Sequence, residues 1–199
     1  MRILKLSDLH QYSLFNFNLF FNKLPSKHLY DIVVIAGDSS NGNYELLKYI
    51  ISKFEKPVYF VLGNHDYGEY VDWKSEIAKN KNFEDIKDLH RQIDFKLMLN
   101  ENTKIKKGND EIAIVGVENW GVKFKKVGDL NKAAANLNKE DFKILMSHDP
   151  SHWDAEVKDH PKNFHLTLSG HTHGFQFGIE IPGIIKWSPV EYVYKQWAG

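Results

Sequence analysis

Cysteine is absent from this chain of 199 residues. Its absence excludes disulfides, thiolate metal sites, iron–sulfur clusters and cysteine nucleophiles. An excess of either charge is absent too, since 26 basic residues balance 26 acidic ones, and we expect no bulk binding of nucleic acid. The longest apolar runs, Ile32–Ala36 and Val58–Leu62, are far too short to cross a bilayer, and no signal-peptide core follows Met1. We therefore expect a soluble, cytoplasmic protein.

Nothing in the sequence marks a boundary between domains. It has no internal repeat, low-complexity block or linker rich in proline and glycine. Hydrophobic residues make up 42% of the chain, enough to bury one core, and the length fits one domain better than two. We predict a single domain over residues 1–199.

Short apolar runs that end abruptly in polar clusters are the recurring pattern of the chain. Such runs, rich in valine and isoleucine and bounded by glycine or proline, are typical of buried strands. Helical spacing of apolar residues lies between them, over 44–54, 83–93 and 128–138. The alternation predicts an α/β layered fold, in which ligands bind beyond the carboxyl ends of the strands. The predicted strands are Ile3–Leu6, Ile32–Ala36, Val58–Leu62, Ile112–Val117, Phe142–Met146 and Phe164–Leu168.

Metal-type ligands cluster just beyond five of these strands. One such cluster alone is typical of a solvated turn or a helix cap. Together they exceed what core packing needs at one sheet edge, and they are too many for one four-coordinate ion. Two ions about 3.5–4 Å apart, sharing a carboxylate and a bridging water or hydroxide, would use all of them. The seven residues are Asp8, His10, Asp38, Asn64, His148, His171 and His173.

The donor atoms of this set are nitrogen and oxygen only. Such donors suit manganese, iron, zinc, cobalt or nickel and do not choose among them. We expect two divalent ions per chain, manganese, iron, zinc or a mixed pair. Cations of this kind lower the pKa of bound water and so supply hydroxide near neutral pH.

The order of the motifs resembles that of the calcineurin-like metallophosphoesterase superfamily, and the resemblance covers almost the whole chain. Residues 116–121 and 147–153 look like its bacterial branch, which includes membrane-associated phosphoesterases. The resemblance implies a four-layer α-β-β-α sandwich of two mixed sheets flanked by helices. The motifs are Asp8-x-His10, Gly37-Asp38, Gly63-Asn64-His65-Asp66, His148 and Gly170-His171-x-His173.

The same resemblance implies roles for individual residues. One metal would be held by Asp8, His10, Asp38 and His173, and the second by Asp38, Asn64, His148 and His171. A hydroxide that bridges the two metals would attack phosphorus. The catalytic residues would be His65, which assists the leaving group, and Asp66, which orients His65.

Two departures from the family pattern concern the pocket wall. Ser39-Ser40-Asn41 stands where many relatives carry a further acidic residue, and Gly174-Phe175-Gln176 replaces Gly-Gly-Gln. They leave monoester, diester, nucleotide and lipid pyrophosphate substrates open. A catalytically silent scaffold that binds a protein partner is the alternative. The enzyme is favoured because all seven ligands and His65 are present.

Two aromatic segments could contact a membrane or a second copy of the chain. As a helix, Leu14–Leu24 would place Phe17, Phe20 and Phe21 on one stripe. That stripe suits a buried helix, which we favour slightly, or an apolar lip for peripheral lipid or membrane contact. Near the C-terminus, Val190–Trp197 is expected as a final helix or strand. If the chain lacks the last strands of its fold, these aromatics would promote self-association.

Overall fold

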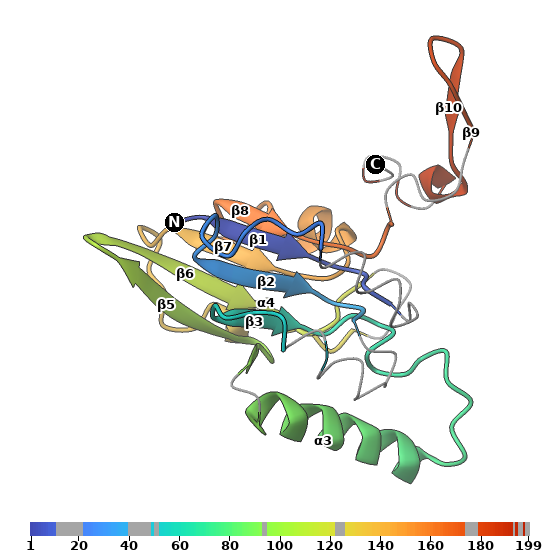
Figure 1. Cartoon of the computed structure of the whole chain (residues 1–199), viewed down its shortest axis with the longest axis horizontal. Helices are drawn as coiled ribbons and strands as arrows, with labels where there is room; N and C mark the ends of the chain where they lie inside the picture. Colours follow the sequence, from blue (N-terminus) through green and yellow to red (C-terminus); the bar gives the residue numbers. More distant parts are fainter. Residues whose placement is uncertain are drawn as a thin grey trace.

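The computed structural model describes residues 1–10, 22–39, 49, 52–92, 95–121, 126–173, 179–192, 194 and 197. Two four-stranded sheets and a separate two-stranded hairpin are present in this part of the chain. Figure 1 shows the two sheets stacked, with the hairpin outside them. The predicted helices over 14–24 and 44–54 fall almost entirely outside the described residues.

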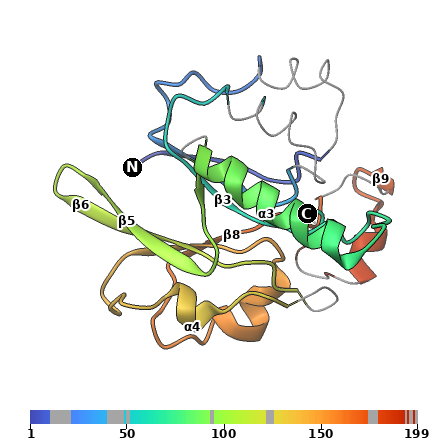
Figure 2. The same ribbon diagram turned by 90° about the horizontal axis from the view of Figure 1, so that it is seen from below.

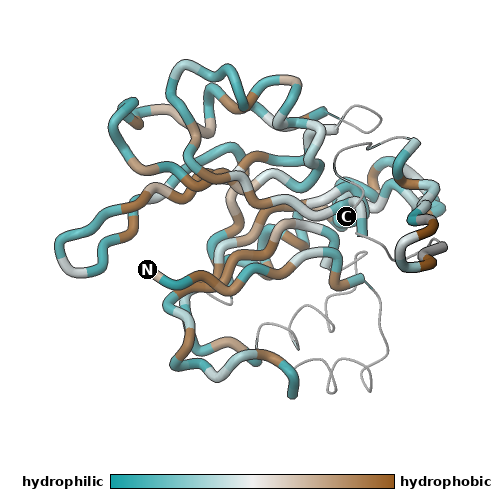
Figure 3. Tube along the Cα trace, turned by 90° about the horizontal axis from the view of Figure 1, so that it is seen from above, coloured by the Kyte–Doolittle hydropathy of each residue, from teal (hydrophilic) through white to brown (hydrophobic). Residues whose placement is uncertain are grey.

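The first sheet carries its strands in the order β1-β2-β3-β4, and every pairing is parallel. Its two central strands are buried along their whole length, which explains their unbroken apolar sequences. Figure 3 shows these strands as hydrophobic and the surrounding loops as mainly hydrophilic. The strands are β1 (Ile3–Leu6), β2 (Ile32–Ala36), β3 (Val58–Val61) and β4 (Lys96–Leu97).

The second sheet has the order β5-β6-β7-β8 and is mixed. β5 and β6 form an antiparallel hairpin, whereas β6, β7 and β8 run parallel. The predicted two-sheet α/β sandwich is confirmed, with one difference: in the first sheet the four described strands are all parallel rather than mixed. The strands are β5 (Glu101–Lys107), β6 (Asp110–Gly116), β7 (Lys143–Met146) and β8 (Leu166–Leu168).

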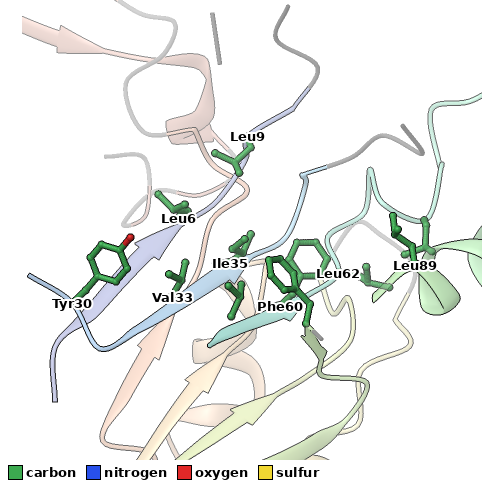
Figure 4. Packing of buried hydrophobic residues seen from close by; sticks show 11 residues of the cluster. Leu6, Leu9, Tyr30, Val33, Ile35, Phe60, Leu62 and Leu89 are labelled. Carbon is green, nitrogen blue, oxygen red and sulfur yellow. The ribbon is translucent and has the colours of Figure 1, made fainter. Parts of the chain in front are cut away.

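Three apolar layers hold the sandwich together. Between the sheets, Ile32, Val34 and Val61 pack with Ile114 and Met146. Figure 4 shows the outer face of the first sheet, where side chains of β1, β2 and β3 meet Leu89 of α3 (Glu76–Gln92). On the outer face of the second sheet, α4 (Leu130–Ala133) packs on β6 and β7. Figure 2 shows α3 along β3 and α4 on the side of β5 and β6.

The helical elements differ in length from the predictions. α3 extends the predicted 83–93 helix by seven residues at its N-terminus, whereas the 128–138 pattern yields only the single turn of α4. Asp129 caps this turn by accepting the Lys132 N–H. Asn136 then adopts φ +60°, a left-handed conformation that ends helices. A π-helical turn covers Trp153–Val157.

The C-terminal part forms its own small hairpin. β9 (Ile179–Ile181) pairs antiparallel with β10 (Ile185–Trp187), and a 3-10 helix follows at Pro189–Tyr192, where a final helix or strand was expected. Among described strands, β8 forms one edge of the second sheet. Tyr192 is 76% exposed, and self-association through such aromatics stays a prediction. None of the described helices has the length and apolarity needed to span a bilayer.

Candidate metal centre

Backbone hydrogen bonds draw the strand-end loops together. Asp8 N–H donates to the carbonyl of Gly37, and His10 N–H donates to the carbonyl of Asp38, both at 3.0 Å. The loops after β7 and β8 are joined in the same way, since Gly170 N–H donates to the carbonyl of His148 at 2.9 Å. The His171 N–H links these two pairs of loops by donating to Oδ1 of Asp8 at 2.8 Å, so the ends of four strands meet at one place.

Left-handed backbone marks the predicted ligands. A non-glycine residue with positive φ is uncommon and costs about 1–3 kcal/mol. Eight described residues have this conformation, and five of them are predicted metal ligands. Backbone strain is therefore concentrated where ligand side chains must point inward. The five are Asp8 (φ +53°), His10 (+39°), Asp38 (+54°), His171 (+72°) and His173 (+57°).

Glycines give the ligands the space they occupy. Gly37 has φ +87°, and a Cβ there would lie 2.4 Å from Nδ1 of His148. A Cβ on Gly63 would lie 2.2 Å from Oδ1 of Asp38, and a Cβ on Gly170 would lie 2.3 Å from Oδ2 of Asp8. No side chain fits at those distances, so the glycines of the three motifs are required by close packing against the ligands.

The first ligand group contains Asp8, His10 and His173, which together could hold an ion. The Nε2 atoms of His10 and His173 are 3.0 Å apart, and their rings are stacked with centroids 4.6 Å apart. Nε2 of His173 lies 3.8 Å from Oδ1 of Asp8. The carboxylate of Asp8 also accepts the backbone N–H of His171 at 2.8 Å, so the group is tied to the neighbouring loop.

The second ligand group contains Asp38, His148 and His171. Nδ1 of His148 faces the carbonyl of Ala36 at 2.7 Å, so the neutral ring donates there and leaves Nε2 with its lone pair. Nε2 of His148 lies 3.0 Å from Oδ2 of Asp38 and 3.2 Å from Nδ1 of His171. Asp38 also forms a third group with His10 and His65, so its carboxylate lies between the first two groups.

These groups fit divalent cations. Two nitrogen ligands about 2.1 Å from one ion lie about 3.0–3.4 Å apart for angles of about 90–109°. The shortest separations in the two groups, 3.0 and 3.2 Å, fall in this range, whereas Asp8 and His173 lie 3.8 Å apart. Oδ1 of Asn64 is buried without a hydrogen-bond partner. A buried polar atom without a partner is costly, and coordination of a cation satisfies it.

Electrostatics prepares two of the proposed histidine ligands for a cation. Burial lowers the pKa of His10 and of His171, which keeps both rings neutral at pH 7, the form that binds metal. Burial opposes a charge on His148, but the adjacent carboxylate of Asp38 outweighs it and raises the pKa of His148. Burial likewise would raise the pKa of Asp38, yet His148 lowers it. An ion that binds there must displace the proton of His148.

His65 and Asp66 have different surroundings. The His65 ring lies at the mouth of the site, edge-on to His10 at 4.8 Å and beside Tyr70, which is 63% exposed, at 4.4 Å. Asp66 is fully buried, and its carboxylate accepts the backbone N–H groups of Asp38, Ser39 and Gly63 at 2.8–3.1 Å. Its contacts therefore fix the two loops to each other, and a role in orienting His65 stays a prediction.

A family comparison accounts for this arrangement. The model of the calcineurin-like phosphoesterase family matches residues 1–175. The chain belongs to this family. The resemblance carried by the five motifs is thereby confirmed, as is the prediction that the chain carries groups for metal binding.

Two curated relatives are named metallophosphoesterases. An uncharacterized one from Campylobacter jejuni is 30% identical over 184 residues, covering 88% of this chain and 45% of the relative. One from Caenorhabditis elegans is 29% identical over 163 residues, covering 76% of this chain and 32% of the relative. The chain therefore spans less than half the length of either relative.

Solved structures share the calcineurin-like fold at low sequence identity. Phosphopantetheinyl hydrolase (PptH) from Mycobacterium tuberculosis superposes with a TM-score of 0.59 at 13% identity, over 99% of this chain and 93% of that one. NAD nucleotidase (NadN) from Haemophilus influenzae gives a TM-score of 0.57 at 17% identity, over 90% of this chain and 39% of that one. These likenesses show the fold.

The structure adds a brace that sequence reasoning missed. Oγ of Ser147 lies 2.9 Å from Nδ1 of His152, whose Nε2 lies 3.3 Å from Oε2 of Glu156. Trp120 stacks on His152 and donates its indole N–H to Glu156. Ser147 and His152 are fully buried, which denies substrate access to a serine nucleophile. These hydrogen bonds instead hold the backbone just before His148. In the sequence, the five-residue spacing of Ser147 and His152 is the one pattern that indicates the contact.

Loss of the shared carboxylate should disturb both ligand groups. Metal-free wild-type protein loaded with Mn²⁺ or Zn²⁺ should hold close to two ions per chain by elemental analysis after removal of free metal. Asp38→Ala should hold fewer ions at both positions, because its carboxylate lies between the groups. Asp110→Ala, at the exposed first residue of β6, is the control and should match wild type. One ion in wild type, or two in Asp38→Ala, would contradict the dinuclear site.

Proposed function

We propose that this chain hydrolyses phosphoester bonds with a pair of divalent metal ions. The observation that supports it most is the contact between the two ligand groups through Asp38, with His65 at their open side. Family membership supports metal-dependent phosphoester hydrolysis in general. We assign the first ion to Asp8, His10, Asp38 and His173. We assign the second ion to Asp38, Asn64, His148 and His171.

The work divides between the ions and the side chains. When bound, the cations supply positive charge beside the phosphoryl oxygens and make a water nucleophile available near neutral pH. His65 lies within ring contact of His10, close enough to give a proton to a departing alkoxide. Asp66 holds the backbone of Gly63 and Asp38, which keeps the loop that carries His65 in place.

A catalytically silent scaffold that binds a protein partner is the second candidate function. Six of the seven proposed ligands fall in the described groups, in which His65 also occurs, and this favours the enzyme over a scaffold. A phosphoester substrate is consistent with the family. Lipid contact through Leu14–Leu24 stays a proposal, because the structure describes only residues 22–24 of this segment. Among these, Leu24 packs against the core.

A metal-dependent phosphoesterase assay tests the proposed function. Purified chain with added Mn²⁺ should hydrolyse bis-p-nitrophenyl phosphate, p-nitrophenyl phosphate or a nucleotide, and the relative rates separate diesterase from monoesterase. The chelated protein and the Asp38→Ala variant should lose that activity. A two-ion protein that cleaves none of these substrates would favour the scaffold.

Removal of His65 should separate metal binding from turnover. His65→Ala should retain both ions but lower turnover by about 10²–10⁴-fold, because a general acid is lost. The loss should shrink for p-nitrophenyl esters, whose leaving group needs little protonation, and be largest for alkyl esters. His28→Ala, an exposed histidine, is the control. Unchanged turnover of an alkyl ester would show that His65 takes no part in the reaction.

A further inference from the structure

Tyr194 reaches back to the metal centre from beyond the residues that match the family model. Its hydroxyl donates to Oδ2 of Asp149 at 2.9 Å. Its ring lies edge-on to the ring of His171, with centroids 5.4 Å apart. Asp149 is 1% exposed, so this carboxylate is buried between a phenol and a proposed metal ligand.

The carboxylate lies on the side of His171 that faces away from the other ligands. Oδ2 of Asp149 is 3.8 Å from Nε2 of His171, whereas Nδ1 of His171 is 3.2 Å from Nε2 of His148. A neutral imidazole carries one N–H, and a carboxylate beside Nε2 favours the proton there. The lone pair of Nδ1 is then directed toward His148, where an ion would bind.

The position of the carboxylate is itself fixed. Oδ1 of Asp149 accepts the backbone N–H of Ser151 at 2.8 Å, and the hydroxyl of Tyr194 holds Oδ2. Gly121 leaves room for it, since a Cβ there would lie 2.4 Å from Oδ2. The carboxylate therefore has little freedom to turn away from His171.

The backbone of Tyr194 makes hydrogen bonds to residues on both sides of it in the sequence. Tyr194 N–H donates to the carbonyl of Val190 at 2.8 Å, and Trp197 N–H donates to the carbonyl of Tyr194 at 2.8 Å. Trp197 also lines a cavity of about 460 Å³ with Gly170 and Thr172, which flank His171. Tyr194 and Trp197 thus lie beside the loop that carries His171.

We propose that Asp149 and Tyr194 are a positioning pair that fixes the tautomer and orientation of His171 and thereby sets the affinity of the second metal ion. The pair rests on the proposed function in one respect, namely that His171 ligates an ion. Neither residue touches the reacting atoms. Tyr194, which lies beyond the family match, therefore tunes the metal centre through Asp149, which lies within it.

Metal titration of hydroxyl-deleted variants tests the pair. Tyr194→Phe keeps the ring and removes the hydrogen bond to Asp149, and the control Tyr192→Phe makes the same change at an exposed tyrosine. Calorimetric titration of metal-free protein with Mn²⁺ should show the second ion about 10–100-fold weaker in Tyr194→Phe, with the first ion unchanged. Metal-free melting temperatures should match wild type, and Tyr192→Phe should bind like wild type.

A double variant tests whether Tyr194 acts on the affinity of the second ion through Asp149. Asp149→Asn should weaken the second ion at least as much as Tyr194→Phe, and combining the two should add little, because Tyr194 acts through Asp149. Additive losses would contradict that linkage and overturn the pair.

Three other results would overturn the inference. A Tyr194→Phe protein that binds both ions like wild type would overturn the positioning pair and leave the proposed function intact. Equal weakening of both ions together with a lower metal-free melting temperature would show a structural role only. A wild-type protein that binds no second ion would overturn this inference and the dinuclear function together.

Discussion

The buried carboxylate of Asp38 is the constraint on which the site depends. Its Oδ1 accepts the backbone N–H of His65 at 2.9 Å, and its Oδ2 faces His148 at 3.0 Å. Its backbone carbonyl accepts the N–H of His10, and its own N–H goes to Asp66. One residue therefore joins loops from both sheets, and its negative charge is stable in that buried place only beside positive charge, supplied by protonated His148 or by cations.

The strain around Asp38 follows from that convergence. A tight turn after each strand brings the side chains inward, and it does so through left-handed backbone at Asp8, Asp38 and His171. Glycines at the adjoining positions remove the side chains that would collide with the ligands. The sheets can bear this strain because three apolar layers pack them and because β2, β3 and β7 are buried along their whole length.

Much of this could be predicted from the sequence, for identifiable reasons. Strands such as β2 and β3 are unbroken runs of buried apolar residues, and ordered motifs follow them, so the layers and the convergence of the candidate ligands were predictable. β4 has only two residues, and β5 reads as a polar segment that depends on pairing with β6, so neither gave an apolar signal. The contact between Asp149 and Tyr194 joins residues 45 positions apart, with no local pattern to announce it.

Anomalous diffraction from crystals of the chain loaded with Mn²⁺ tests the central claim most directly. The account predicts two anomalous peaks about 3.5–4 Å apart. One peak should lie among Asp8, His10 and His173, the other among Asn64, His148 and His171, with Asp38 contacting both. A single peak, or two peaks that do not share Asp38, would contradict it.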